Sequence, residues 1–225
     1  MEQILDLFLS PKHLNSSLNW FRHLNFYMKD SIIVKDDFCP DIDLVRNSAL
    51  QSGFGTWAPS KGEVGSSIYE GMNFWGDHAS LLKGLYAALG RPVFPNSMFF
   101  RATKPGTEKA YVHSDRDAGS WTAIVYCSDH KEVSRTGFYQ HQETGLKDMP
   151  SFDELRANPE FFDQLKKEMV DGDDSVWEQI DFVRGVYNRA LIFRAPLFHA
   201  RCPKDGFGSG TDETARIVWV CHFEL

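Results

Sequence analysis

The sequence predicts a mainly β protein with an α-helical cover, folded as a sandwich or barrel. From Pro92 onward it carries short runs rich in strand-forming residues, separated by turn residues. These runs cover residues 93–103, 109–115, 120–129, 136–143, 189–195 and 214–225. Short strands with few helices between them are typical of sandwiches and barrels. The chain has 225 residues, of which 42% are hydrophobic, so it can bury one sizeable core.

Residues 1–91 are predicted to form an α-rich cover that belongs to the same domain as the β core at 92–225. Residues 14–30 have a helical pattern, whereas residues 53–67 form a loop rich in Gly, Pro and Ser. Residues 77–90 have the pattern of a second helix, which ends in a glycine.

An acidic segment at about 147–175 interrupts the β pattern and is predicted to be a helical insertion. Ser151 and Glu154 have the spacing of a capping box. The Asn-Pro pair that ends at Pro159 suits the start of a second helix. A strand and turn are expected to follow over residues 177–188.

The charge and the cysteines of the chain limit its compartment and its partners. The formal net charge of -7 argues against binding to nucleic acid or to anionic lipid, both of which attract basic surfaces. The first apolar run is short and acidic, so we expect neither a signal peptide nor a membrane span. No C-x-x-C pair occurs, so we expect reduced thiols. Together these features predict a cytoplasmic protein without membrane or nucleic-acid partners. The cysteines are Cys39, Cys127, Cys202 and Cys221.

A histidine and an aspartate two residues apart form the strongest candidate for a metal site. In an extended chain His113 and Asp115 point to the same side, so they can bind one ion together. Such a pair is expected roughly once by chance in this composition, and a third ligand is needed. His199 is the best candidate, with His78 and His222 as alternatives. Two His and one carboxylate leave three coordination positions open, as in non-haem Fe(II) oxygenases.

Two other imidazole–carboxylate pairs have the same spacing. His130 and Glu132 lie in a charged turn, where a solvated imidazole is the ordinary state. His141 and Glu143 lie in a predicted strand and are the more serious rival, because Glu is also an acceptable ligand. We favour His113 and Asp115 on the residues that surround them.

Several segments that follow in order resemble a known family. They are HSD at 113–115, TAIVY at 122–126, TGFYQH at 136–141, NRALIFRAPLFH at 188–199 and ARIVWVCHF at 215–223. Their order resembles that of the Fe(II)- and 2-oxoglutarate-dependent dioxygenases, specifically the prolyl-hydroxylase-like and phytanoyl-hydroxylase-like branches. The resemblance covers about residues 92–225 and leaves the first part of the chain unmatched.

The resemblance implies a double-stranded β-helix, or jelly roll, with His113, Asp115 and His199 as the Fe(II) ligands. It also implies that Arg216 binds the distal carboxylate of 2-oxoglutarate and that Tyr126 donates to the same carboxylate. A guanidinium suits this role because it offers two parallel donors and does not lose its charge.

Two features depart from the family pattern. His199 and Arg216 are seventeen residues apart, which is longer than usual in the family, and a Gly-rich loop takes up the difference. Val218 and Val220 stand where the family often has Ser or Thr. One carboxylate contact is therefore missing or supplied by another group, for which Arg101 is the candidate.

Each of these residues also has a purely structural interpretation. Arg216 could be a strand-end cation paired with Asp212 or Glu213 at the surface. Tyr126 could be a core aromatic whose hydroxyl finds any convenient partner, and His199 a satisfied core histidine.

The function implied by the resemblance is oxidation of a C–H bond, as hydroxylation, with 2-oxoglutarate converted to succinate and CO₂. The substrate would be a small molecule or a protein side chain, and the sequence does not choose between them. One alternative is a non-catalytic jelly roll that binds a ligand or partner. Another is a cupin-type metal enzyme, which the absence of an H-x-H pair disfavours.

Overall fold

A computed structural model gives the structure of residues 31–57, 69–106, 110–130, 134–171, 174–204 and 207–225. The chain divides into two compact units, residues 1–33 and residues 34–225. Residues 34–91 thus belong to the same unit as the β core. The helix expected over residues 14–30 lies outside the described residues.

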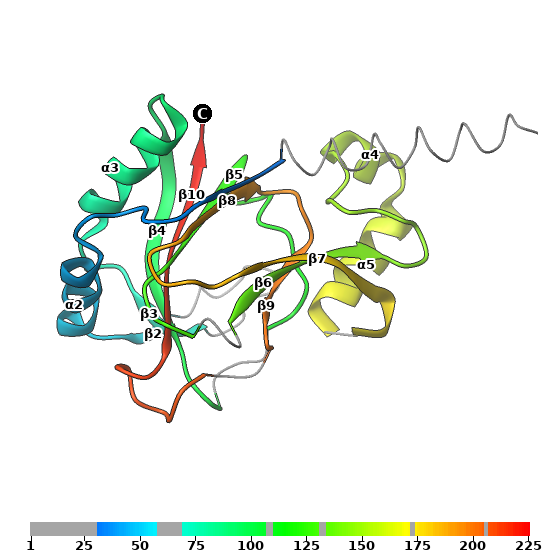
Figure 1. The fold of residues 1–225 in the computed structure, drawn as a ribbon. Helices are drawn as coiled ribbons and strands as arrows, with labels where there is room; N and C mark the ends of the chain where they lie inside the picture. The colour runs from blue at the N-terminus through cyan, green and yellow to red at the C-terminus, as the bar shows by residue number, and fades with distance from the viewer. Residues whose placement is uncertain (1–30, 58–68, 107–109, 131–133, 172–173, 205–206) are drawn as a thin grey trace, which may run out of the picture. The chain divides into compact units, whose positions relative to one another are not determined.

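A seven-stranded sheet is the larger of the two sheets that the described residues form (Figure 1). Its strands, in spatial order, are β1 (Ile32–Lys35), β8 (Ala190–Arg194), β5 (Trp121–Tyr126), β10 (Arg216–Glu224), β4 (Phe94–Thr103), β3 (Tyr69–Asn73) and β2 (Gly55–Trp57). The pairs from β8 to β2 are antiparallel. Runs of β-branched and aromatic residues such as WTAIVY and RIVWVCHFE form the centre of this sheet, which is buried on both faces.

A second, three-stranded antiparallel sheet contains β7 (Trp177–Arg184), β6 (Arg135–His141) and β9 (His199–Cys202), in that order. From β4 onward the chain passes from the large sheet to the small one, back through β8, across to β9 and back again to β10. The prediction of a mainly β fold is therefore confirmed.

The two faces of β10 have different neighbours, because side chains alternate along a strand. Trp219 donates its indole N–H to His78 Nδ1 at 2.9 Å, so the odd-numbered side chains face α3 (His78–Leu89). Arg216 donates from Nε to Ser134 Oγ at 2.9 Å, just before β6. We call this second face the inner face, and on β10 it carries Arg216, Val218, Val220 and His222.

Residues 109–115 were expected to form a strand, and this prediction is wrong for the described part of the segment. Only His113 pairs, in an isolated bridge with His199. Asp115 then donates its backbone N–H to Ala195 at 3.0 Å, and the chain turns at once. A sharp turn directly after the bridge leaves no room for a longer ladder.

Residues 31–91 are less helical than predicted. They contain α2 (Ile42–Ser52) and α3, but also the three short strands β1 to β3. Gly71 makes the pairing of β3 with β4 possible: it has φ +69°, and a Cβ there would lie 2.0 Å from the carbonyl oxygen of Ala102. The segment is therefore a mixed α and β cover.

The helix expected over residues 77–90 is confirmed as α3. Asp77 caps its first turn by accepting hydrogen bonds from the N–H groups of Ala79 and Ser80. Gly90 ends the helix in the left-handed conformation at φ 67°.

The helical insertion is also confirmed, as α4 (Phe152–Ala157) and α5 (Pro159–Asp171). Ser151 and Glu154 form the predicted capping box, and Pro159 is the first residue of α5. In Figure 1 both helices lie beside the small sheet. Leu165 of α5 joins residues of the small sheet and of neighbouring segments in a second apolar core, which is formed by Val112, Tyr139, Leu165, Trp177, Phe198, Ala200 and Cys202.

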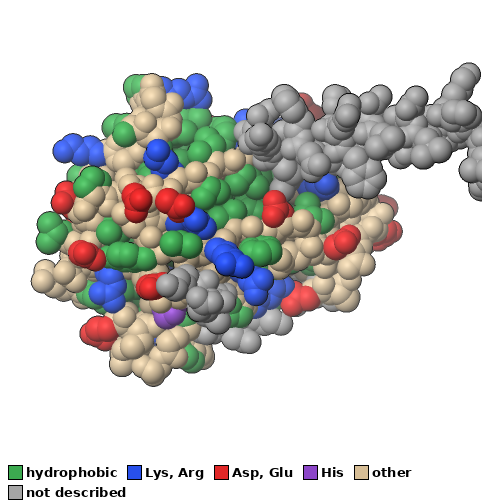
Figure 2. Space-filling view, in the orientation of Figure 1, with side chains coloured by type: hydrophobic (Ala, Val, Ile, Leu, Met, Phe, Trp, Pro, Cys, Tyr) green, Lys and Arg blue, Asp and Glu red, His purple; other side chains and the backbone are tan. Residues whose placement is uncertain are grey.

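The described residues include no helix that is long and apolar enough to cross a membrane. All four cysteines are buried free thiols. Acidic and basic side chains are interspersed on the face drawn in Figure 2, with hydrophobic side chains between them.

Candidate metal centre

Main-chain pairing brings His113 and His199 side by side, although they are far apart in the sequence. The N–H of His113 donates to the carbonyl of His199 at 3.0 Å, and the N–H of His199 donates back at 2.9 Å. The centroids of the two rings are 4.4 Å apart. Asp115 follows two residues after His113, and its carboxylate reaches both rings.

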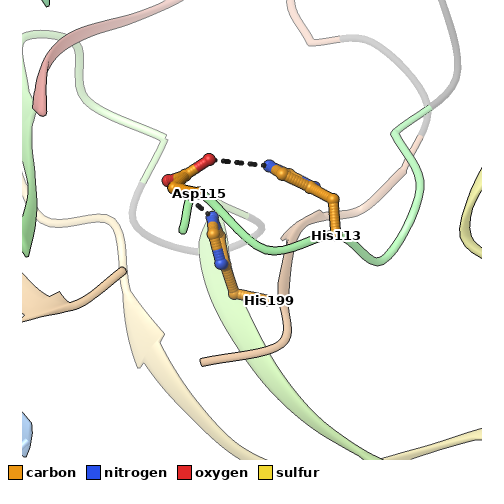
Figure 3. A group of neighbouring side chains, drawn as sticks. All are labelled: His113, Asp115 and His199. Atoms are coloured by element: carbon orange, nitrogen blue, oxygen red, sulfur yellow. Dashed lines mark ion pairs between the residues drawn. The ribbon is translucent and has the colours of Figure 1, made fainter. Parts of the chain in front are cut away.

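Figure 3 shows the carboxylate of Asp115 facing the ring nitrogens of both histidines. In each ring Nδ1 donates to a backbone carbonyl at 2.9 Å, that of Tyr111 for His113 and that of Leu197 for His199. A carbonyl oxygen only accepts, so these bonds place the proton on Nδ1 and leave the lone pair of Nε2 available. The two Nε2 atoms lie 3.6 Å and 3.2 Å from Asp115 oxygens.

The three side chains therefore form a group that could hold a metal ion. One ligand atom from each of His113, Asp115 and His199 lies within 4.8 Å of the other two. The side chain of His113 is 50% exposed, whereas that of His199 is 5% exposed. The group is thus open to solvent on the side of His113 and closed on the side of His199.

The electrostatics of this group favour a cation beside the carboxylate. Burial opposes the charge of Asp115, but His199 and His222 hold the pKa of its carboxyl well below the usual range. Although half of the His113 side chain is exposed, desolvation of its ring within the cluster and the neighbouring His199 lower the pKa of His113 to about 4. Burial also opposes charge on His199, yet Asp115 raises its pKa. At neutral pH an anionic carboxylate therefore lies beside a neutral, metal-competent imidazole.

Two further side chains of the large sheet contact the same carboxylate. Thr122 of β5 donates to Asp115 Oδ2 at 2.9 Å, and Nε2 of His222 lies 3.4 Å from the same oxygen. The sequence suggested His222 only as an alternative third ligand. The sequence feature that could have placed His222 near the site is the alternation of side chains along β10. His222 lies an even number of residues after Arg216, so both are on the inner face.

Arg216 is buried at the start of β10, with 4% of its surface exposed. Its guanidinium lies over the ring of Tyr126 at 5.4 Å and over that of Phe207 at 5.7 Å. No carboxylate pairs with it among the described residues, and burial lowers its pKa. Such a cation is ready to receive an anionic ligand.

The alternative surface ion pairs of Arg216 are absent from the described part of the chain. Asp212 pairs instead with Lys104 at 2.9 Å. Glu213 is exposed, and its backbone carbonyl accepts a hydrogen bond from Arg46 at 2.8 Å.

Tyr126 and Arg101 both lie on the inner face, because each is paired in register with Val218. The hydroxyl of Tyr126 is hydrogen-bonded to Thr136 Oγ1 at 2.8 Å. Tyr126 therefore supports the guanidinium of Arg216 and also has a partner of its own. The charge of Arg101 is among the influences that lower the pKa of His113.

Comparison with known proteins places the chain in a family. No curated protein matches it. A model of the family DUF6445, which is described as a family of unknown function, matches residues 90–214. The chain belongs to DUF6445.

Solved structures resemble this DUF6445 protein at low identity. AviO1 from Streptomyces viridochromogenes Tue57 has 14% identity and a TM-score of 0.47, covering 87% of this chain and 90% of its own. HygX from Streptomyces hygroscopicus, with nickel and 2-oxoglutarate bound, has 12% identity and a TM-score of 0.46, covering 88% and 85%. SnoK, a non-heme alpha-ketoglutarate-dependent carbocyclase from nogalamycin biosynthesis, has 11% identity and a TM-score of 0.48, covering 88% and 81%.

Of the two rival pairs considered from the sequence, that of His141 and Glu143 does not form in this DUF6445 protein, and that of His130 and Glu132 is not tested. His141 is buried and contacts Glu168 of α5 at 3.0 Å, whereas Glu143 is exposed. The ring of His130 lies beside Phe207 at 5.5 Å, and Glu132 lies outside the described residues.

Proposed function

We propose that this DUF6445 protein is an Fe(II)- and 2-oxoglutarate-dependent oxygenase that hydroxylates a small molecule or a protein side chain. One observation carries the proposal. Beside the inner face of the large sheet, the imidazoles of His113 and His199 lie next to the carboxylate of Asp115, with their Nε2 atoms available. The same face carries the buried guanidinium of Arg216, which has no carboxylate partner among the described residues. The first group suits a divalent metal, and the second suits a carboxylate ligand.

The side chains of the cluster fit iron. His113, Asp115 and His199 provide two nitrogen donors and one oxygen donor, which is the donor set of non-haem Fe(II) oxygenases. Their second contacts also fit, because metal-binding histidines usually donate the other ring N–H to a carbonyl or carboxylate. Three protein ligands leave room for a chelating co-substrate and for O₂.

The surroundings of Arg216 fit 2-oxoglutarate. A buried charge without a partner is costly, and a carboxylate that binds two guanidinium N–H groups offsets this cost. Nε is already held by Ser134, and the rings of Tyr126 and Phe207 limit the movement of the planar group. One end of a dicarboxylate would bind here and leave its 2-oxoacid end for the metal.

The protein residues hold, orient and shield the reacting groups. When bound, iron and 2-oxoglutarate would supply oxidation of a C–H bond by O₂, with formation of succinate and CO₂. Phe193 packs edge-on against His199 at 4.7 Å and against Phe138 at 5.4 Å, so an apolar wall excludes water behind the buried ligand. Arg216 orients the co-substrate through its charge.

The strand order supports a double-stranded β-helix as the architecture of this site. The strands β4, β10, β5 and β8 lie next to one another in the large sheet, while β9, β6 and β7 form the small one. The bridge of His113 to His199 would add the segment before β5 as the outer neighbour of β9. Four strands would then face four, as in a jelly roll of the prolyl-hydroxylase-like or phytanoyl-hydroxylase-like kind.

Anaerobic addition of Fe(II) and 2-oxoglutarate tests the proposal. We expect a weak visible charge-transfer band with the wild-type protein and none with His113→Ala, because the variant lacks one imidazole donor. Subsequent addition of O₂ should produce succinate. A folded wild-type protein that gives no band would contradict the proposal.

Arginine variants in the same experiment separate the two halves of the site. Arg216→Met should keep Fe(II) binding and lose the band at 2-oxoglutarate concentrations that saturate the wild type, because the carboxylate loses its charged partner. Arg101→Met is the matched control on the same inner face. If only Arg101→Met loses the band, Arg101 binds the co-substrate in place of Arg216.

A further inference from the structure

His222 has contacts that differ from those of the two histidines of the cluster. Its Nε2 lies 3.4 Å from Asp115 Oδ2, and its Nδ1 lies 2.7 Å from the hydroxyl oxygen of Ser97. We propose that His222 is a positioning residue, which with Ser97 and Thr122 directs the carboxylate of Asp115 toward the metal. This inference rests on the proposed metal-binding role of Asp115.

The partner of Nδ1 distinguishes a positioning histidine from a ligand. In His113 and His199 this nitrogen faces a carbonyl, which only accepts, so Nε2 keeps its lone pair. In His222 it faces a hydroxyl, which can donate. Ser97 can therefore donate to Nδ1, and the proton of His222 then lies on Nε2, where it is donated to Asp115.

The three positioning side chains form a row across the centre of the large sheet. Ser97 of β4 and Thr122 of β5 are both paired in register with His222 of β10. Thr122 is fully buried, and the side chain of His222 is 11% exposed beside the ring of Phe99. The backbone ladder of three adjacent strands thus holds the row in place.

The row acts on one oxygen of the carboxylate. Thr122 and His222 both lie against Oδ2 of Asp115, which Nε2 of His199 also approaches to 3.2 Å, whereas Oδ1 is the oxygen nearest to Nε2 of His113. His222 is not part of the group whose ligand atoms all lie within 4.8 Å of one another. Two donors on Oδ2 turn Oδ1 toward the open side of the cluster, where the metal would bind.

Titration with Co(II), a visible-absorbing probe for Fe(II), tests this role through metal affinity and without turnover. We expect His222→Phe and Thr122→Val each to weaken Co(II) binding by about 10- to 100-fold, the usual effect of removing a hydrogen-bond partner of a ligand. The stoichiometry should remain that of the wild type. His222→Gln should recover most of the affinity, because its amide can still donate, and His130→Gln should match the wild type.

Three outcomes would overturn the inference. Wild-type affinity in His222→Phe and Thr122→Val would show that Asp115 needs no support. Complete loss in His222→Phe, equal to that in His113→Ala and without recovery in His222→Gln, would make His222 a ligand, as in a site with three imidazoles. Failure of the wild type itself to bind Co(II) or Fe(II) would overturn the proposed function as well. Thr122→Val changes little in volume, so it keeps the test valid if His222→Phe does not fold.

Discussion

His199 and His141 each lie close to a carboxylate, at 3.2 Å from Asp115 and 3.0 Å from Glu168, yet the two groups are built differently. His199 belongs to a cluster with His113, which is half exposed. His141 is 1% exposed, its Nδ1 is 2.8 Å from the hydroxyl of Thr144, and its ring packs against Trp177 at 5.2 Å.

The comparison shows that donor number and access, more than residue type, distinguish a metal site from a structural contact. The pair of His141 and Glu168 joins β6 to α5 and thereby holds the helical insertion against the small sheet. It brings together two donors, whereas the cluster brings together three. The short contact places an imidazole and a carboxylate, both mostly buried, against each other, so removing one of them would leave the other without its neighbour.

The largest expected effect is on the cluster. Asp115→Ala removes the anionic ligand, and we expect the Co(II) affinity to fall by about a hundredfold or more, beyond the loss for residues that only support a ligand. Far-UV circular dichroism should stay like that of the wild type. An unchanged Co(II) affinity in Asp115→Ala would show that the metal binds elsewhere. The cluster would then not differ in function from the pair of His141 and Glu168.

A substitution in the buried pair should have the opposite pattern. Glu168→Ala leaves the buried imidazole of His141 without its carboxylate, which should lower the free energy of unfolding by about 1–3 kcal/mol. Co(II) affinity should be unchanged. Glu143→Ala, at the exposed residue that the spacing suggested as a partner, is the matched control and should change stability by less than about 0.5 kcal/mol. Loss of metal binding in Glu168→Ala would make the pair part of the site.

The smallest effect is expected at the start of the insertion. Ser151→Ala removes the N-cap of α4 and should lower the free energy of unfolding, measured with urea at pH 7, by about 1 kcal/mol without altering metal affinity.

Hydrogen bonds from the Ser151 side chain and backbone lower the pKa of Glu154 below its usual value. The contribution of Glu154 to the free energy of unfolding is therefore fully present above the ordinary pKa of a glutamate and is lost as the pH falls through the lowered pKa. Glu154→Gln should accordingly differ from the wild type more at pH 7 than at pH 3, and an equal difference at both would show that the charge has no role.

Much of the fold could be predicted because its signals are local. The capping residues of α3 and α4 and the β-rich runs of β4, β5 and β10 have the boundaries expected within a few residues. The strand predicted before Asp115 does not form among the described residues. A ladder of hydrogen bonds needs partners that lie far away in the chain, and local signals do not specify them. Only a bridge to His199 forms there.

The sequence by itself determined that the protein is mainly β, and it proposed the spacing and order of His113, Asp115 and His199. These properties follow from side-chain periodicity and from the resemblance of ordered motifs. Only the tertiary structure decided that Arg216 is buried rather than paired with Asp212, and that a row across three strands supports Asp115. Cross-strand neighbours depend on the register between distant segments, and a linear sequence does not state that register.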